Sequence, residues 1–486
     1  MAGIAGVVGK REIGLMEQML GVIEHRGPDK LRVRRAEGLC VGVRASDLSE
    51  ARGDGFASDG EVAVLFDGEI YNDRPKGMSD AQIALHLYQK YGRAFASHLE
   101  GVFACAVCDG DTVTLARDSV GVRPMYFGST ETGGFCFASE AKSLIGVTED
   151  LQELPPSTTL SSASGLAGYV PQMPPVSLGE CFETAKDQLF ALMLQAVQRR
   201  LEDGAAGACL LSGGLDSSII ACAAHHLGAE LPLITVGVEG APDLDNARIV
   251  AEHLGLAHHV FLFDREQIRQ SVPQAVWMLE SFDEDCVSGA ISNLFASANA
   301  KQFTNCILSG EGGDELFGGY HLLKDLPTES ERLDMMGRLI EIAYNTAVQR
   351  LDRAMMGNSI NYRTPFIDTD VVAFALQLPV RWKIHDAGDG ELIEKYILRE
   401  AFKGLLPEPI YRRKKLRFAA GTGTDGLMDE LASAERVAKN FNEHARQTAE
   451  GYQLNSPKEL WYYRLFKERF PAPCFEKLVG RWDPDK

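Results

Sequence analysis

Hydrophobic spacing divides the chain into two regions. In the first, up to roughly residue 145, short apolar runs predict strands, for example over 62–66. Helical spacing occurs at Ile13, Met16, Leu20 and Ile23, and again over 79–91, where Ser79 can cap the helix. The runs 102–107 and 113–116 flank Asp109-Gly110-Asp111, which predicts a hairpin. Many strands with few helices indicate an α+β sandwich of layers.

The second region alternates short apolar runs with helical segments. We expect helices over 183–201, 217–226 and 244–254, and strands over 208–211, 233–238 and 259–262. Apolar strands separated by helices are typical of a doubly wound parallel sheet. From residue 329 onward the pattern is mostly helical.

A proline-rich segment separates the two patterns. Its prolines are Pro155, Pro156, Pro171, Pro174 and Pro175. Such a segment marks a break between folded units. Because 486 residues exceed one ordinary core, we predict two domains, 1–165 and 176–486.

Composition narrows the class of protein without naming its chemistry. The chain is 45% hydrophobic and 24% charged, with a net charge of −19, which disfavours a dedicated nucleic-acid or anionic-membrane binder. We find no apolar run near the roughly 20 residues of a membrane helix and no signal segment. The ten scattered cysteines favour a reduced, cytoplasmic compartment. Although the chain as a whole is acidic, residues 412–417 form a local basic segment.

Residues 212–218, which read Ser-Gly-Gly-Leu-Asp-Ser-Ser, lie between a predicted strand and a predicted helix. Gly213 and Gly214 let the backbone approach an anion, and serine hydroxyls with the helix N–H groups can bind phosphate. Asp216 offers a carboxylate to Mg²⁺. The GK[ST] ending of a Walker A loop is absent, so transfer of a γ-phosphoryl group is not expected.

This loop resembles the pyrophosphate-binding loop of the N-type ATP pyrophosphatases. More narrowly, nearly the whole chain is similar to the glutamine-dependent asparagine synthetase family, whose relatives include β-lactam synthetase. The first half matches at His25-Arg26-Gly27-Pro28-Asp29, Gly68-Glu69-Ile70-Tyr71-Asn72, Arg117-Asp118, Pro124-Met125-Tyr126 and Ala138-Ser139-Glu140-Ala141-Lys142. The second half matches over 309–320, over 363–368 and at Arg413-Lys414-Lys415.

The resemblance implies an Ntn-type amidotransferase domain followed by an ATP-pyrophosphatase domain. A carboxylate, by default that of aspartate, attacks the α-phosphate of ATP, and an amine then displaces AMP from the acyl-adenylate. Lys415 is implied to stabilise charge on the α-phosphoryl oxygens, and Glu311 to position or deprotonate the amine. Asp216 and Asp314 are implied to hold Mg²⁺. The implied ATP and pyrophosphate contacts are Leu211, Ser212, Gly213, Gly214, Asp216, Ser217, Ser218, Val236, Gly237, Ser309, Gly310 and Arg363.

The amidotransferase half departs from its family at two positions. Ala2 stands where the family has its nucleophilic cysteine, and Asp67 stands where an asparagine donates to the oxyanion. An engineered cysteine-to-alanine change would not explain Asp67, so we favour natural loss of glutaminase activity. The positions that bind glutamine in the family, if that function is retained, are Arg44, Asp67, Gly68, Glu69 and Asp80.

The acceptor region also departs from the family. Typical members carry Thr, Ser and often an Arg after the segment 280–283, whereas here no cation lies between Arg269 and Lys301. The acidic pair Glu284 and Asp285 either meets a cationic substrate or faces solvent. Segment 417–421 lacks the usual Ser-Asp. These departures weaken aspartate as the substrate.

We therefore keep two readings of the substrate open. The first is asparagine formation from aspartate, with ammonia or glutamine as nitrogen source. The second is an amide ligase on another, perhaps intramolecular, substrate, as in β-lactam synthetase or a peptide cyclase, with the first half a structural or docking module. Glu311 favours the first, because the β-lactam enzymes have Tyr at that position. A homodimer is one assembly state to test.

Overall fold

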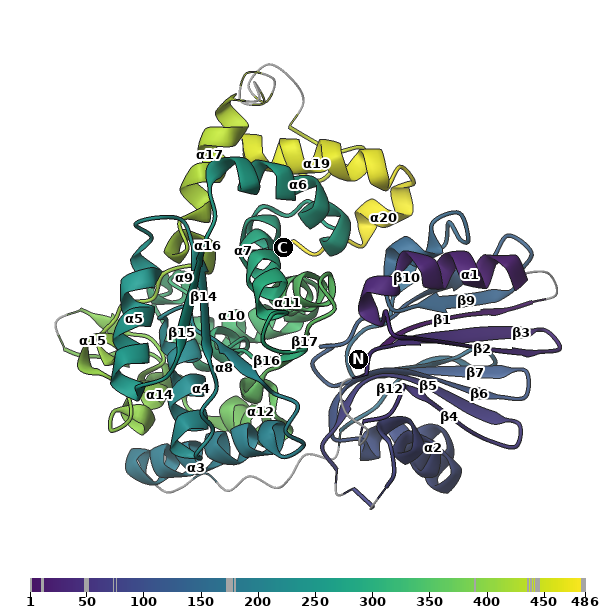
Figure 1. Ribbon diagram of the computed structural model, residues 1–486, viewed down its shortest axis with the longest axis horizontal. Helices are drawn as coiled ribbons and strands as arrows, with labels where there is room; N and C mark the ends of the chain where they lie inside the picture. Colours follow the sequence, from purple (N-terminus) through teal and green to yellow (C-terminus); the bar gives the residue numbers. More distant parts are fainter. Residues whose placement is uncertain are drawn as a thin grey trace.

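The computed structural model describes residues 2–9, 13–47, 52–72, 74–75, 77–171, 178, 181–388, 390–434, 437, 439, 441 and 446–481. The chain forms two lobes that lie side by side (Figure 1). Pro174 and Pro175 of the predicted junction lie outside the described residues.

The N-terminal lobe contains two stacked antiparallel sheets. The first holds β10 (Gln152–Glu153), β8 (Tyr126–Ser129), β9 (Phe135–Ala138), β1 (Ala2–Val8), β3 (Leu39–Ala45) and β2 (Lys30–Ala36) in that order. The second holds β12 (Gly165–Gly168), β11 (Thr158–Ser161), β7 (Thr112–Arg117), β6 (Gly101–Asp109), β5 (Val62–Ile70) and β4 (Phe56–Asp59).

Helices cover the outer faces of these two sheets, so the lobe has four layers (Figure 1). Helix α1 (Ile13–Val22) lies on the first sheet, and α2 (Asp80–Tyr91) lies on the second. Buried apolar side chains such as Ile4, Val41 and Leu65 pack between the sheets. The Ser79 side chain accepts from Gln82 N and completes a capping box. The predicted α+β sandwich is confirmed.

Strand β5 runs further than the sequence pattern predicted. Its expected end at Phe66 gives way to an extended path through Asp67 and Gly68 to Ile70. Gly68 has a φ of 145°, and a Cβ there would lie 2.1 Å from the Val102 carbonyl oxygen. Only glycine lets the strand continue this close to β6. The last strand of the lobe ends at Gly168, beyond the predicted domain end at 165.

The C-terminal lobe is built on a parallel sheet. Its strands are β15 (His258–Leu262), β14 (Leu233–Gly237), β13 (Ala208–Leu210), β16 (Cys306–Leu308) and β17 (Asn361–Arg363), in that order. Apolar residues of α3 (Phe182–Leu201), α4 (Leu215–His226) and α5 (Pro242–Leu254) cover one face. Those of α6 (Arg265–Leu279), α7 (Glu284–Ala300) and α11 (Ala347–Met356) cover the other. This arrangement confirms the doubly wound sheet.

The remainder of this lobe is mostly helical, as predicted. Its helices are α8 (Gly313–Phe317), α9 (Leu322–Asp325), α10 (Glu329–Ile342), α12 (Thr369–Gln377), α13 (Val380–Lys383), α14 (Tyr396–Phe402), α15 (Glu408–Tyr411), α16 (Phe418–Gly421), α17 (Thr424–Ala434), α19 (Pro457–Arg469) and α20 (Pro473–Lys477). A short hairpin, β18 (His385–Asp386) with β19 (Leu392–Ile393), interrupts them. None of the described helices is long and apolar enough to cross a membrane.

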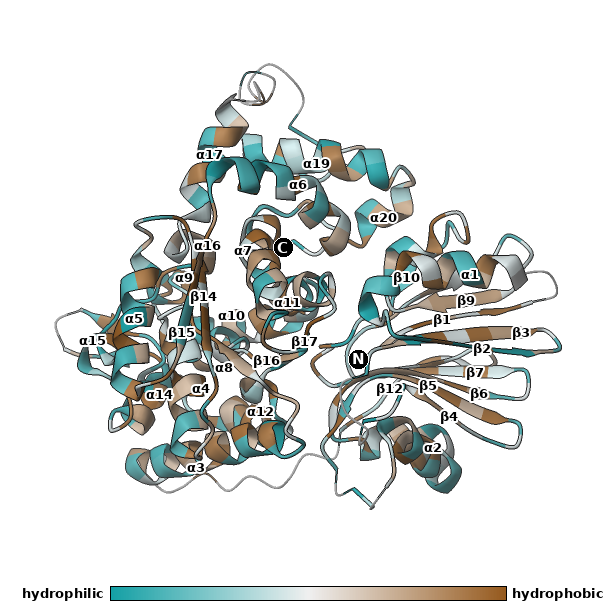
Figure 2. Cartoon of the chain, in the orientation of Figure 1, coloured by the Kyte–Doolittle hydropathy of each residue, from teal (hydrophilic) through white to brown (hydrophobic). Residues whose placement is uncertain are grey.

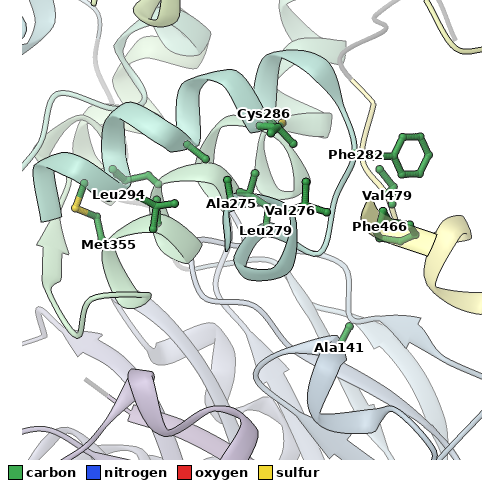
Figure 3. Close-up of a cluster of buried hydrophobic side chains, with 14 of the residues drawn as sticks. Ala141, Ala275, Val276, Leu279, Phe282, Cys286, Leu294, Met355, Phe466 and Val479 are labelled. Carbon is green, nitrogen blue, oxygen red and sulfur yellow. The ribbon is translucent and has the colours of Figure 1, made fainter. Parts of the chain in front are cut away.

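Apolar residues gather on the strands, whereas the outer helices are largely hydrophilic (Figure 2). One large cluster joins α6, α7, α11 and α19, with Leu294 of α7 beside Met355 of α11 (Figure 3). Ala141 of the N-terminal lobe lies at the margin of this cluster. The two lobes therefore share an apolar boundary next to α11.

Candidate active site

The loop between β13 and α4 is held by its own serines. Ser212 N and Oγ contact Ser217 Oγ at 3.1 and 3.0 Å, and Gly214 N donates to Ser212 Oγ at 3.2 Å. The Ser218 hydroxyl donates to Gly214 O at 2.7 Å. Gly213 has a φ of +70°, and a Cβ there would lie 2.5 Å from Ala247 N. The loop is thus preorganised, and glycine is required at 213.

A cavity opens where this loop meets the carboxyl ends of the strands, as expected for a doubly wound sheet. Of the residues predicted for the ATP site and the chemistry, those that line it are Leu211, Ser212, Gly214, Asp216, Ser217, Val236, Ser309, Gly310, Glu311, Asp314 and Lys415. Gly213, Ser218 and Gly237 lie beside the cavity, in the loop, in α4 and at the end of β14. Segments separated by more than a hundred residues therefore meet at one point.

Two carboxylates and two lysines form the charged centre of the cavity. Lys395 Nζ pairs with Asp216 and lies 2.5 Å from Asp314 Oδ1, and Lys415 Nζ pairs with the other oxygen of Asp314. Burial disfavours the Asp314 carboxylate, but the two lysines outweigh it and lower the pKa of Asp314 well below its usual value. Sequence reasoning missed Lys395, which adopts a left-handed conformation (φ 55°) just before α14.

Asp216 and Asp314 fit the requirements of a magnesium ion shared with phosphate. Asp216 Oδ1 is buried and accepts no hydrogen bond among the described residues. Mg²⁺ commonly takes one or two carboxylates and completes its shell with water and phosphate oxygens. In the part of the chain that the structure describes, no group of three or more His, Cys, Asp or Glu could hold a metal by itself. The donors suit a cation that arrives with a nucleotide.

Glu311 lies at the end of the cavity that faces α11. Arg350 Nη2 donates to Glu311 Oε1 at 2.8 Å. Burial raises the pKa of Glu311, with Arg350 opposing that effect and Asp314 adding to it. A carboxylate whose proton affinity is raised in this way suits the transfer or orientation of a proton on an amine.

Only part of the basic segment 412–417 turns inward. Arg413 pairs with Asp243 and donates to Gly213 O at 2.6 Å, so it braces the loop. The side chains of Arg412 and Lys414 are 74% and 80% exposed. Lys415 is therefore the lysine of this segment that reaches the acidic centre.

Arg363, predicted to contact the nucleotide, does not line the cavity. It is 2% exposed, and its guanidinium contacts Glu69 Oε2 at 2.9 Å and Asp203 Oδ2 at 2.6 Å. Glu69 belongs to the N-terminal lobe, where it was expected to bind glutamine. Arg363 thus links the two lobes, because its guanidinium contacts one carboxylate in each of them. Each buried charge is compensated by an opposite charge.

The position of the family's nucleophile is buried and enclosed by fixed charges. Ala2 is 2% exposed, and its backbone N donates to Asp67 Oδ1 at 3.1 Å. Arg26 Nη2 contacts Asp67 Oδ2 at 2.9 Å. The same guanidinium contacts Glu140 at 2.9 Å and, in α11 of the other lobe, Asp352 at 2.7 Å. We call this cluster the Arg26 junction.

The other predicted glutamine contacts also have partners within the protein. Arg44 Nη1 contacts Glu24 Oε1 at 3.0 Å. Asp80 pairs with Arg74 and accepts from Ile70 N at 3.3 Å. Gly68 lies within β5. The charged groups that were predicted to bind glutamine are therefore already paired with other residues of the protein.

Comparisons with known proteins cover both lobes. A family model described as asparagine synthase matches residues 188–339 and 326–472, and one described as a glutamine amidotransferase domain matches 1–162. A glutamine-hydrolysing asparagine synthetase of Gallus gallus is 31% identical, over 97% of this chain and 94% of the relative. One from Arabidopsis thaliana is 30% identical, over 92% and 82%. One from Zea mays is 29% identical, over 100% and 89%.

Proposed function

We propose that this chain, which belongs to the asparagine synthase family, forms asparagine from aspartate, ATP and free ammonia. Membership makes it an ATP-using carbon–nitrogen ligase of the asparagine synthetase type. The observation that carries the finer proposal is the meeting of the 212–218 loop, Asp216, Asp314, Lys415 and Glu311 in one cavity.

The residues that line the cavity suit both half-reactions, which are adenylation of the carboxylate and then formation of the amide. Backbone N–H groups of the loop and of the start of α4 bind the pyrophosphate that leaves. Lys415 stabilises the charge that develops on the α-phosphoryl oxygens as the carboxylate attacks. Mg²⁺ held by Asp216 and Asp314 would neutralise phosphate charge. Glu311 then orients ammonia, or takes its proton, for attack on the acyl-adenylate.

The N-terminal lobe does not supply the ammonia in this proposal. Ala2 has no thiol or hydroxyl, so it cannot form an acyl intermediate with glutamine. Asp67 would repel a developing oxyanion, and the contacts with Arg26 and with Ala2 N hold its carboxylate at this position. We propose that the lobe, which ends between residues 165 and 176, is a scaffold for the synthetase site.

The contacts of α11 support the scaffold role. Asp352 is held by the N-terminal lobe through Arg26 at 2.7 Å and Arg123 at 3.0 Å. Arg353, the next residue, contacts Glu280 at 3.1 Å, and Glu280 accepts from Lys142 N of the N-terminal lobe at 2.6 Å. Arg350, less than one turn earlier, reaches Glu311. The lobe thereby fixes the helix that positions Glu311.

The acidic pair at the start of α7 does not require a cationic substrate. Glu284 contacts Lys458 at 3.0 Å, and Asp285 contacts Arg417 at 2.8 Å. Both charges are therefore neutralised by the protein itself. This removes one argument against aspartate.

The test is a pyrophosphate-release screen with the purified chain. We expect release with aspartate and ammonium, and no added release when glutamine replaces ammonium. Lys415→Ala should abolish release, whereas Arg412→Ala, a matched change at an exposed neighbour, should leave it unchanged. Absence of release with aspartate under either nitrogen source refutes aspartate as substrate. Glutamate formation from glutamine above a blank refutes the silent N-terminal lobe.

A further inference from the structure

Lys415 lies in a segment without regular secondary structure. Residues 413–417 lie between α15 and α16, and in the described part of the chain residues 414–416 form no hydrogen bond between backbone groups. The side chain of Lys415 nevertheless ends beside Asp314 in the cavity. Because neither a helix nor a sheet fixes this backbone, its position depends on side chains of other elements.

Two side chains bind the peptide groups on either side of the Lys415 Cα. Lys415 N donates to Glu394 Oε1 at 3.1 Å, and His321 Nε2 lies 2.8 Å from Lys415 O. A carbonyl oxygen only accepts hydrogen bonds, so His321 Nε2 carries the proton and donates it. We call Glu394 and His321, with these two hydrogen bonds, the Lys415 clamp.

Glu394 is itself fixed by two cations. It is 3% exposed, Arg399 Nη2 donates to its Oε1 at 2.7 Å, and Lys324 pairs with its Oε2. Burial disfavours the Glu394 carboxylate, but Lys324 and Arg399 outweigh it and lower its pKa. Arg399 Nη2 also donates to Arg413 O at 2.9 Å. The acceptor for Lys415 N is therefore ionised and held in place.

His321 joins the two segments that carry the charged centre of the cavity. It is exposed and directly follows the segment 309–320, which presents Asp314. Its hydrogen bond to Lys415 O therefore ties the segment of Asp314 to the segment of Lys415. The bond fixes the distance between these two groups, although His321 does not line the cavity in the described structure.

We infer that His321 and Glu394 are positioning residues, which hold the backbone of Lys415 while its side chain acts on the phosphate. The inference rests on the proposed function, which gives Lys415 its role in adenylation. Lys415 Nζ is paired with Asp314, so stabilising the α-phosphoryl oxygens requires Nζ to shift toward the phosphate. A fixed backbone confines this shift to the flexible side chain. Misplacing a catalytic group by about 1 Å costs on the order of 100-fold in rate.

The first measurement compares the turnover of two histidine variants. His321→Leu removes the donor, whereas His321→Gln keeps an N–H that can donate to the same carbonyl. With ATP, aspartate and ammonium, we expect kcat for pyrophosphate release to fall about 10–100-fold in His321→Leu. KM for ATP should change less than about threefold, because the 212–218 loop still binds the phosphates. His321→Gln should recover most of the wild-type kcat.

His253→Leu is the matched control. His253 is exposed, and its Nε2 lies 3.0 Å from Leu405 O, so this variant also loses a contact between a histidine and a backbone carbonyl. Neither His253 nor Leu405 is among the described residues that line the cavity. We therefore expect His253→Leu to keep the wild-type kcat.

Hydrogen exchange measures the clamp without turnover. The Lys415 N–H is protected by its bond to Glu394, and loss of the bond from His321 lets the segment open more often. We expect exchange of the Lys415 amide to rise about 3–10-fold in His321→Leu, the range for one hydrogen bond. In His253→Leu the Lys415 amide should exchange at the wild-type rate.

The two measurements separate the clamp from the proposed function. If the wild type releases no pyrophosphate with aspartate and ammonium, the proposed function is refuted, and exchange of the Lys415 amide alone decides whether the clamp exists. Unchanged exchange in His321→Leu refutes the clamp. If the wild type is active, an unchanged kcat in His321→Leu overturns the inference. A loss of kcat that His321→Gln does not recover, or that His253→Leu shares, also overturns it.

Discussion

Asp352 offers the sharpest test of the link between the lobes. Its carboxylate is 1% exposed and contacts Arg26 at 2.7 Å, Arg123 at 3.0 Å and the Tyr362 hydroxyl at 3.1 Å. Asp352→Asn keeps the size of the side chain and removes its charge. Two buried arginines then lose a counter-charge, and α11 loses two ion pairs to the N-terminal lobe.

The size of the effect follows from the proton affinity of Asp352. Burial disfavours its carboxylate, but Arg26 and Arg123 outweigh burial and lower its pKa to about 2. Against an ordinary value near 4, this shift stabilises the folded state by about 2.5 kcal/mol at pH 7. Asp352→Asn also leaves the two arginines underpaired. We therefore expect the variant to lose about 3–5 kcal/mol of its free energy of unfolding.

The pH dependence separates this account from a packing effect. Because the folded pKa is lowered, the stabilisation is complete above about pH 5 and is lost as pH falls toward 2. We therefore expect urea unfolding to show that the difference in free energy of unfolding between wild type and Asp352→Asn is about 1 kcal/mol smaller at pH 3 than at pH 7.

Hydrogen exchange in α11 should rise in the Asp352→Asn variant at pH 7, because the opening free energy of that helix falls. The control is Asp245→Asn, at a carboxylate 79% exposed whose pairing with Arg248 is expected to contribute less than about 1 kcal/mol. A gap that stays constant with pH, or a destabilisation no larger than that of the control, would refute the reasoning.

Three further predictions concern single sites. Ala2→Cys alone should release no glutamate from glutamine, since Asp67 still repels the oxyanion; release by Ala2→Cys without a change at Asp67 would contradict this. Gly213→Ala should raise KM for ATP about tenfold or more, because its Cβ would lie 2.5 Å from Ala247 N; unchanged ATP kinetics would count against a preorganised loop. Burial raises the pKa of Glu459 to about 7, so the folded state favours the protonated acid, and stability should fall as pH rises from about 5 to 8. Glu459→Gln should flatten that slope, measured by urea unfolding between pH 5 and pH 8.

Elements that depend on neighbouring residues were predicted closely from the sequence. Helix α2 begins after Ser79 and ends at Tyr91, as its cap and its apolar spacing indicate. The hairpin at Gly110 forms because that residue adopts a positive φ of 57°. The conformation of the 212–218 loop is set locally, because its serines hydrogen-bond to groups within the same segment and Gly213 adopts a positive φ. In each case the determining contacts lie within a few residues along the chain.

Contacts between distant residues could not be predicted in this way. Arg363 lies two residues before Pro365 in a family motif, which suggested that it braces a phosphate or a carboxylate, yet nothing in the sequence pointed to its partner Glu69, 294 residues away. Arg350 shows no pattern along the chain that would point to its partner Glu311, which is 39 residues away. Lys395 likewise acquires its two carboxylate partners only through the fold. Pairing of buried charges across a lobe boundary is a property of the tertiary structure.

The Arg26 junction has a consequence for the history of the chain. One arginine contacts the position of the family's nucleophile and also α11, so a change at one of the two sites bears on the other. A lineage that regained a thiol at residue 2 would also have to release Asp67 from Arg26, and a change at Arg26 disturbs Asp352 in the other lobe. Under the proposed function, the junction therefore couples any recovery of glutamine hydrolysis at residue 2 to the anchoring of α11 in the other lobe.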